Sequence, residues 1–170
     1  MTRYVLLFFF IVTTLFAIEL LPIGQKAVVI PFTSAVTRLS AGLMQLFDGR
    51  VLAQGKMIWD QDSGFAVSIE AGCNGIEAGI ILVAAMLAFP SRWREKAIGI
   101  LVGLATVQML NLVRIISLFY IGQWNKTFFE WAHLYVWQAL IMLDVLIVFL
   151  FWLRWLTADG QARRLREEGA

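Results

Sequence analysis

Long apolar runs constrain the fold of this chain more than any other feature of its sequence. They lie at about residues 4–21, 73–89, 97–121 and 128–155. A helix needs about 20 mostly apolar residues to cross the hydrocarbon core of a bilayer. The chain is 60% hydrophobic, whereas soluble domains are about 45–50% apolar. We therefore predict an all-α integral membrane protein with about four transmembrane helices.

Basic residues gather at one set of span ends and predict the orientation of the chain. They are Arg3, Arg92, Arg94, Lys96, Arg154, Arg163, Arg164 and Arg166. Short cytoplasmic loops carry an excess of Lys and Arg. We therefore expect the 91–96 loop and a tail at 156–170 in the cytoplasm, and the segment 22–72 and the 123–127 loop outside.

The extracytoplasmic segment 22–72 is predicted to contain a helix that lies in the membrane interface. Apolar residues recur there at helical spacing among polar ones, at Val36, Leu39, Leu43 and Leu46. That pattern is typical of an interfacial amphipathic helix. The alternative, a further span at 27–47, would bury Arg38 and place the 91–96 loop outside, against the charge rule.

Two short runs after this helix predict a β-hairpin. Val51–Trp59 and Gly64–Ile69 flank the turn-forming stretch Asp60–Gly64, which is typical of two strands joined by a loop. The second strand leads directly to Cys73. No soluble module is evident, so residues 1–170 are predicted to form a single polytopic membrane domain.

Several function classes are disfavoured by composition. A single Cys rules out an internal disulfide or a dithiol redox pair. With only one His as well, we expect no transition-metal site. No Gly-rich phosphate loop is present, and no basic cluster interleaved with aromatics favours nucleic acid. We expect no cofactor, no metal and no nucleic-acid partner.

Cys73 is the first candidate for chemistry. It precedes an apolar helix and is followed by the turn-forming residues Asn74 and Gly75. Free amides and the helix dipole at a helix start favour thiolate over thiol, so a reactive Cys73 should titrate below a free thiol. The alternative is that the lone cysteine is a small apolar filler.

Arg114 and His133 are the other two candidates. An Arg inside a span is costly and usually faces a protein interior or a pathway, and it suits the stabilisation of an anion. A neutral imidazole suits proton transfer near pH 7. The alternatives are snorkelling or an ion pair of Arg114 with Glu77 or Glu130, and an interfacial role for His133.

The three candidates are predicted to lie at a similar depth below the outer surface. We expect them to face one cavity, with Cys73 within about 6 Å of at least one partner, since an Arg facing lipid is unfavourable. Glu77 follows Cys73 by four residues on one helical face and Asn111 lies one turn from Arg114. Both are candidate supporting residues, together with Asn74 and Gly75.

These residues, in this order, resemble the exosortase/archaeosortase family. The matching motifs are Cys73-Asn74-Gly75, Asn111-Leu112-Val113-Arg114 and His133. The small size and the Gly-Cys-Asn-Gly-Ile-Glu sequence look most like the exosortase H group. The resemblance implies a Cys nucleophile that forms an acyl-thioester, an Arg that donates a proton or holds the oxyanion, and a third residue that stabilises the transition state.

The resemblance also implies a substrate class and a location. The expected function is a membrane-embedded cysteine peptidase or transpeptidase of the bacterial inner membrane, with its site on the extracytoplasmic side. It would cleave exported proteins whose C-terminus carries a sorting motif, a transmembrane helix and a basic tail. The alternative is a non-enzymatic assembly or sorting factor that binds partner helices through the faces of Gly75–Gly79 and Gly99–Gly103 and holds anionic lipid at Arg114.

Overall fold

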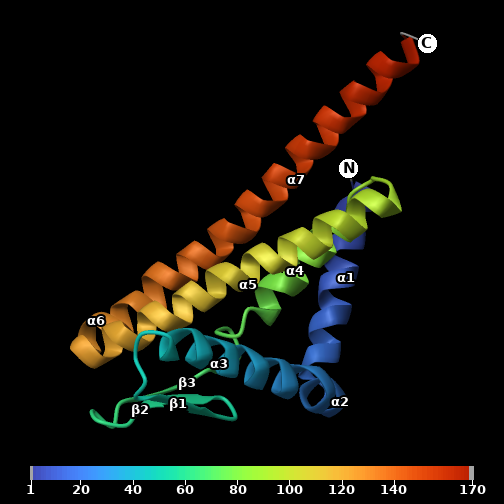
Figure 1. Cartoon of the computed structure of the whole chain (residues 1–170). Coiled ribbons are helices and arrows are strands. Elements are labelled where there is room, and N and C mark those ends of the chain that lie inside the picture. Colours follow the sequence, from blue (N-terminus) through green and yellow to red (C-terminus); the bar gives the residue numbers. More distant parts are fainter. Residues whose placement is uncertain (1, 169–170) are drawn as a thin grey trace.

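A computed structural model describes residues 2–168, and the side chains of residues 2–160. The predicted cytoplasmic arginines at 163, 164 and 166 therefore lie outside the described side chains. The chain is mostly helical with one small sheet (Figure 1). The helices are α1 (Thr2–Leu20), α2 (Pro22–Gly24), η1 (Gln25–Val29), α3 (Ile30–Gln45), α4 (Ile76–Ala88), α5 (Trp93–Trp124), α6 (Lys126–Trp131), η2 (Ala132–Val136) and α7 (Trp137–Glu168). The strands are β1 (Val51–Gln54), β2 (Met57–Asp60) and β3 (Ala66–Ser68).

Four helical segments in the described part of the chain are long and apolar enough to cross a membrane, which confirms a multi-pass membrane protein. They are Thr2–Leu20, Pro22–Gln45, Trp93–Trp124 and Lys126–Gly160. This set differs from the predicted spans at two places. Pro22–Gln45, where the sequence analysis rejected a span in favour of an interfacial helix, is long and apolar enough to cross a membrane. The helix expected at 73–89 is the 13-residue α4, about 20 Å long at 1.5 Å per residue, which is short of a ~30 Å bilayer core.

The long helices alternate in direction. The N-terminal end of α1, the α4–α5 loop and the C-terminal end of α7 lie toward one end of the molecule (Figure 1). The α1–α2 turn, the sheet and the α5–α6 turn lie toward the other end, and α3 runs across it. Arg3, near the N-terminus, and the basic residues of the 91–96 loop therefore lie toward the same end. The charge pattern of the sequence predicted this grouping.

Helix α3 turns its small hydroxyl side chains, together with Val36, Ala41 and Met44, toward the protein. Thr33, Thr37 and Ser40 are buried, whereas Leu39 and Leu46 are 53% and 81% exposed. An amphipathic helix is present within the candidate span Pro22–Gln45, and these two leucines face away from the molecule. In a bilayer or at its surface those leucines would contact lipid, so the inward polar face is free to bind loops of the same chain.

The sheet contains three antiparallel strands in the order β1-β2-β3, not the predicted two-stranded hairpin. The expected first strand at 51–59 is broken at Gly55, whose φ of +60° turns the chain back after Gln54. A glycine adopts that left-handed conformation at little cost. One face of the sheet packs on α3 and α5, where Val51, Ile58 and Ile69 join Met44 and Phe119 in a buried cluster.

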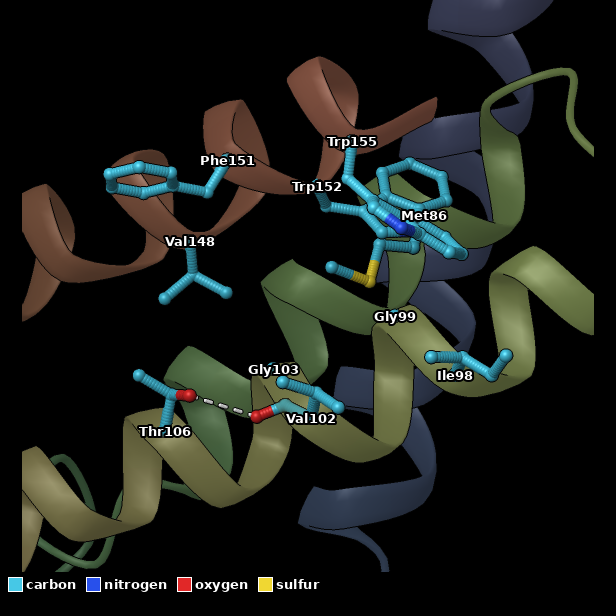
Figure 2. A pocket seen from close by; sticks show the side chains of 10 residues that line it. All are labelled: Met86, Ile98, Gly99, Val102, Gly103, Thr106, Val148, Phe151, Trp152 and Trp155. Atoms are coloured by element: carbon cyan, nitrogen blue, oxygen red, sulfur yellow. Dashed lines mark hydrogen bonds between the residues drawn. The ribbon is translucent and has the colours of Figure 1, made fainter. Parts of the chain in front are cut away.

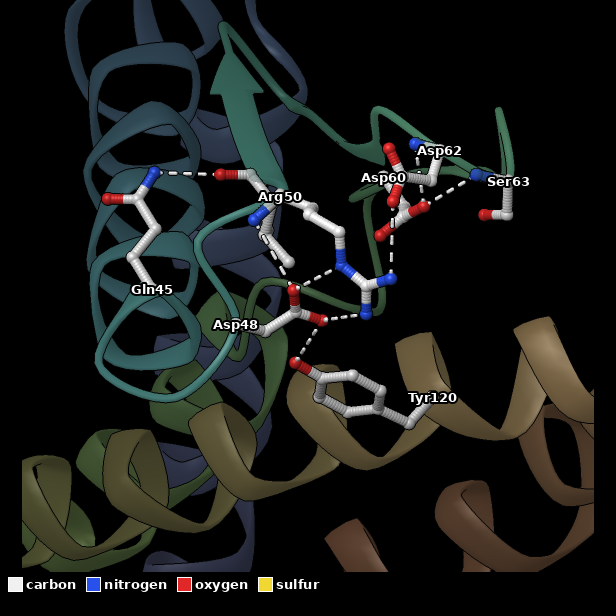
Figure 3. Close-up of polar contacts among 8 residues, drawn as sticks. Gln45, Asp48, Arg50, Asp60, Asp62, Ser63 and Tyr120 are labelled. Atoms are coloured by element: carbon white, nitrogen blue, oxygen red, sulfur yellow. Dashed lines mark hydrogen bonds and ion pairs between the residues drawn. The ribbon is translucent and has the colours of Figure 1, made fainter.

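A polar cluster ties the sheet to α5 (Figure 3). Arg50 Nε lies 3.0 Å from Asp48 Oδ1 and its Nη1 lies 3.3 Å from Asp62 Oδ2. The Tyr120 hydroxyl donates to Asp48 at 3.4 Å. Asp60 is buried, and the hydrogen bond from the main-chain N–H of Ser63 holds its carboxyl pKa below the ordinary value. The cluster fixes the sheet beside the C-terminal part of α5.

Glycines of α5 bring this helix close to α7 and α4 at the far end of the molecule. A Cβ added at Gly99 would lie against the Trp152 ring, and one at Gly103 would meet Leu82 at 2.8 Å. The Trp152 indole donates to the Glu95 carbonyl at 3.2 Å. Beside this contact lies an apolar pocket of about 420 Å³ that includes Val148 (Figure 2). The contact anchors α7 on α5 well away from Cys73.

Candidate active site

The loop between β3 and α4 presents Cys73. Two glycines in the left-handed region bracket it, Gly72 with φ +81° and Gly75 with φ +80°. The Cys73 N–H donates to the Glu70 carbonyl at 3.0 Å and so closes a tight turn. Side chains with a β-carbon rarely adopt these two φ values. The Gly-Cys-Asn-Gly sequence is therefore explained by the shape of this turn, which leaves the thiol half-buried.

Two polar side chains, those of Glu77 and Asn74, hold the loop in place through hydrogen bonds. The Glu77 carboxylate accepts the Gly72 N–H at 2.5 Å. Asn74 is fully buried, and its Oδ1 accepts the Ile76 N–H at 3.0 Å, which caps the start of α4. Its amide Nδ2 donates to Thr33 Oγ1 on α3 at 3.1 Å. Glu77 and Asn74 therefore position this loop, residues 70–75, without contacting the thiol. Because Cys73 is the candidate nucleophile, this segment is called the nucleophile loop below.

Arg114 reaches the loop from the middle of α5. Its side chain is 2% exposed, its Nη1 donates to the Gly72 carbonyl at 3.1 Å and its Nη2 lies 3.6 Å from Cys73 Sγ. Among the described residues, no carboxylate lies within ion-pair distance of its guanidinium, so the considered pairs with Glu77 and Glu130 do not form. Its Nε is buried without a hydrogen-bond partner. Arg114 therefore brings an unneutralised positive charge to the thiol.

His133 reaches the same thiol from a different helix. Its Nε2 lies 3.9 Å from Cys73 Sγ, and its ring stacks on Phe129 with 5.7 Å between centroids and 6° between planes. It lies in η2, a π-helical turn within the helix that continues as α7. Such turns occur frequently at functional sites. The thiol is thus contacted by an imidazole and a guanidinium. This agrees with the prediction that the three side chains lie at a similar depth and close together.

A pocket of about 390 Å³ opens onto these three side chains. Its walls also include the consecutive residues 65–70 and, from α5 and α6, Ile115, Leu118 and Phe129. The volume falls within the range of ligand-binding pockets, about 300–1,000 Å³. No group of three His, Cys, Asp or Glu side chains that could hold a metal ion occurs among the residues that the structure describes. The chemistry of the pocket is that of a thiol beside an imidazole and a guanidinium.

Comparison with protein families agrees with this geometry. The family model described as transmembrane exosortase (Exosortase_EpsH) matches residues 2–153, which include the nucleophile loop and both of its partners. The chain belongs to the transmembrane exosortase family. Comparisons with curated proteins and with solved structures gave no match. Family membership makes an exosortase-type transpeptidase the function to test against this site.

The electrostatics of this exosortase thiol differ from the sequence-based prediction. Burial raises the pKa of the Cys73 thiol above its ordinary value, the Arg114 charge lowers it, and the charges of Glu77 and Glu70 raise it again. The prediction that the helix start would lower this pKa was wrong. Helix α4 begins three residues later at Ile76, and Asn74 already accepts that residue's N–H, so the thiol does not sit on free amides.

Asn111 packs behind the nucleophile loop of the exosortase. It is 2% exposed, and neither of its amide atoms has a hydrogen-bond partner. A Cβ added at Gly75 would lie 3.2 Å from Asn111 Nδ2 and 2.7 Å from Gln108 Nε2. Gln108 donates from that nitrogen to the Asn74 carbonyl at 3.3 Å. Asn111 and Gly75 therefore act in the packing of the loop and not in contact with Cys73 Sγ.

Several residues of this exosortase site were missed by the sequence analysis. Thr33, Gln108, Phe65 and Phe129 all contact the loop or the pocket. Thr33 and Gln108 are polar residues within apolar helices, and that signal was available. Nothing in the sequence distinguishes Phe65 and Phe129 from the other aromatic residues of the chain.

Proposed function

We propose that this exosortase is a membrane-embedded cysteine peptidase or transpeptidase that cleaves the C-terminal sorting signals of exported proteins. The observation that carries the proposal is the double contact on one thiol. His133 Nε2 lies 3.9 Å and Arg114 Nη2 lies 3.6 Å from Cys73 Sγ. A nucleophile beside a base and an oxyanion donor is the arrangement that covalent acyl transfer requires.

The first half-reaction forms the acyl-enzyme. His133 Nε2 takes the proton from Cys73 Sγ, and the thiolate attacks the scissile carbonyl carbon. The carbonyl oxygen becomes an oxyanion, which the Arg114 guanidinium stabilises. His133 then returns its proton to the leaving amine as the C–N bond breaks, so that a thioester remains on Cys73. We expect the distance of 3.9 Å between His133 Nε2 and Cys73 Sγ to shorten when a bound substrate orders the site, because catalytic hydrogen bonds are often long in unliganded enzymes.

The second half-reaction releases the acyl group. Water or an amine from an acceptor molecule attacks the thioester carbon, and His133 accepts the proton of this nucleophile. The C–S bond breaks, and the Cys73 thiolate recovers a proton from His133. Water as the nucleophile gives a peptidase and an amine gives a transpeptidase. The residues of the site are the same in both cases.

The substrate class and the membrane side follow from the family and the charge pattern. Exosortase substrates are exported proteins with C-terminal sorting signals, so we propose that the site faces the extracytoplasmic side of the inner membrane. The basic 91–96 loop and Arg3 lie toward the opposite end from the sheet and the nucleophile loop (Figure 1), which supports this orientation.

The test compares cells that express the wild-type chain with cells that express Cys73→Ala. Quantitative mass spectrometry of protein C-termini should show exported proteins that keep an apolar helix and a basic tail only in the Cys73→Ala cells. Ser34→Ala, an α3 substitution outside the pocket, is the matched control and should process normally. Identical C-termini in wild-type and Cys73→Ala cells would leave a non-enzymatic assembly factor as the better account.

A further inference from the structure

Strand β3 has one edge without a partner strand. The sheet order β1-β2-β3 places β2 on one side of β3 only. The Phe65 carbonyl accepts the Asp60 N–H at 2.9 Å, and the Ile69 N–H donates to the Lys56 carbonyl at 2.8 Å. Because the pairing alternates along an antiparallel ladder, the main-chain groups of Ala66 and Ser68 point away from β2.

These outward groups have no hydrogen-bond partner within the described part of the chain. No main-chain or side-chain bond reaches the N–H or C=O of Ala66 or Ser68. The opposite edge of the sheet is different. On β1, the Val51 N–H donates to the Asp48 carbonyl and the Val51 carbonyl accepts Gln45 Nε2 at 2.8 Å. Among the described residues, the β1 edge is therefore capped at Val51 and unpaired at Ala53, whereas the β3 edge is open at both of its outward residues.

The open edge lies in the wall of the pocket that contains the thiol. Ala66 and Ser68 line the same 390 Å³ pocket as Cys73, Arg114 and His133. Strand β3 continues through Ile69 and Glu70 directly into the nucleophile loop. A chain that paired with β3 would therefore run on toward the thiol.

An aromatic series holds this edge at a fixed place relative to His133. The Phe65 ring lies edge-on to Phe119 at 5.8 Å and to Phe129 at 6.4 Å, and Phe129 stacks on His133. Gly122 makes room for this insertion, since a Cβ there would lie 2.3 Å from the Phe65 ring. Strand β3 and the imidazole are thereby positioned by one rigid group of rings.

We propose that the substrate binds its cleavage segment as an extended strand added to the open edge of β3, which leads the scissile carbonyl to Cys73. The inference rests on the peptidase function proposed above and names how its substrate is held. Unpaired N–H and C=O groups that recur at every second residue match the main chain of an extended peptide. A short edge of this kind is also one that does not invite aggregation.

Proline substitutions test the strand pairing, because proline removes one main-chain N–H. Ala66→Pro and Ser68→Pro delete donors that do not bond to β2, so the ladder of the sheet is kept. Ala66→Val and Ser68→Val are the matched controls, since they add similar bulk and keep the N–H. The probe is an exported reporter that ends in a sorting motif, an apolar helix and a basic tail, and its processing is measured in wild-type and Cys73→Ala cells as well.

The proposal predicts that each proline variant lowers kcat/KM for the reporter about tenfold or more relative to its valine control, because a hydrogen bond is lost and the proline ring blocks the edge. The rate at which iodoacetamide alkylates Cys73 should stay within about twofold of wild type, since the thiol and its two partners are untouched. If one proline variant does not fold, the other proline variant is compared with its own valine control, and that comparison tests the proposal.

A disulfide trap provides an independent measurement. In a chain that carries Cys73→Ala and Ser68→Cys, oxidation should link position 68 to single cysteines placed at alternate residues of the reporter's cleavage segment. Equal processing by the proline and valine variants, or no cross-link at any position of the segment, overturns strand addition and leaves the peptidase intact. Normal processing by Cys73→Ala overturns both.

Discussion

Phe129 stacks flat on His133, with 5.7 Å between the ring centroids and 6° between the ring planes. The stack fixes the imidazole so that Nε2 faces Cys73 Sγ at 3.9 Å, while Nδ1 is buried without a hydrogen-bond partner. In many enzymes a carboxylate or carbonyl orients the catalytic His through its second nitrogen. Here an aromatic ring takes that place.

Phe129→Leu should therefore reduce activity without unfolding the chain. Leu keeps an apolar side chain at the position but loses the flat surface that orients the imidazole, so we expect a loss of about tenfold in kcat/KM, a part of what a general base contributes. The neighbouring Phe128, which is 42% exposed, offers Phe128→Leu as the control. Equal reporter processing by the two variants would contradict a positioning role for Phe129.

Arg114→Lys tests the oxyanion role. Lys keeps a positive charge but loses the planar fork that lets one side chain contact both the Gly72 carbonyl and Cys73 Sγ. We expect a loss of about 100-fold in kcat, as for the removal of an oxyanion donor. Arg38→Lys, at an exposed position on α3, should leave kcat unchanged. Full activity of Arg114→Lys would mean that charge alone is needed.

The pH dependence of Cys73 alkylation tests the electrostatics of the site. Burial raises the pKa of the thiol and Arg114 lowers it. The alkylation rate should therefore rise with pH around a midpoint above that of a free cysteine, about 8.5. Arg114→Gln removes the lowering charge, so its midpoint should move higher still. A midpoint that stays in place in Arg114→Gln would refute this coupling.

His133→Ala should show a processing defect that eases as the pH rises. Once the solution itself deprotonates the thiol, a general base contributes less to the attack. Reporter cleavage by wild type and His133→Ala, measured across the pH range in the same membranes, should converge toward alkaline pH. A constant ratio between the two variants would point to a structural role for the imidazole.

The convergence of the site could be predicted from sequence because an Arg inside an apolar helix is expensive to leave in lipid. Arg114 had to face a protein interior, and Cys73 and His133 were the polar groups available at its depth. The behaviour of the thiol could not be predicted, because it depends on Gly75 and Asn74 ending the loop before α4 begins. That boundary depends on tertiary packing against Thr33 and Gln108.

The fold, like the site, could be predicted only in part. Hydropathy located the apolar helices, but it could not show that α4 has only 13 residues or that Gly55 splits the first predicted strand. An apolar run looks the same whether it forms one long helix or a loop followed by a short helix. Likewise, the run at 51–59 looks like one strand in the sequence, and its composition does not reveal the turn that Gly55 permits.

Topology can be tested by cysteine labelling in a Cys73→Ser background. Ser63 lies in the exposed turn before β3, and Ser91 lies in the α4–α5 loop at the opposite end of the molecule. An impermeant maleimide should label Ser63→Cys in intact cells and should label Ser91→Cys only after the membrane is permeabilised. The reverse pattern would place the thiol on the cytoplasmic side.

The central claim is that Cys73 carries the acyl group. The most direct measurement is mass spectrometry of the wild-type chain after brief exposure to the exported reporter. We predict a covalent adduct on Cys73 that hydroxylamine releases, as expected of a thioester, and that is absent from Cys73→Ala, which should also leave the reporter uncleaved. Full processing of the reporter by Cys73→Ala, with no adduct on the wild-type thiol, would contradict the account.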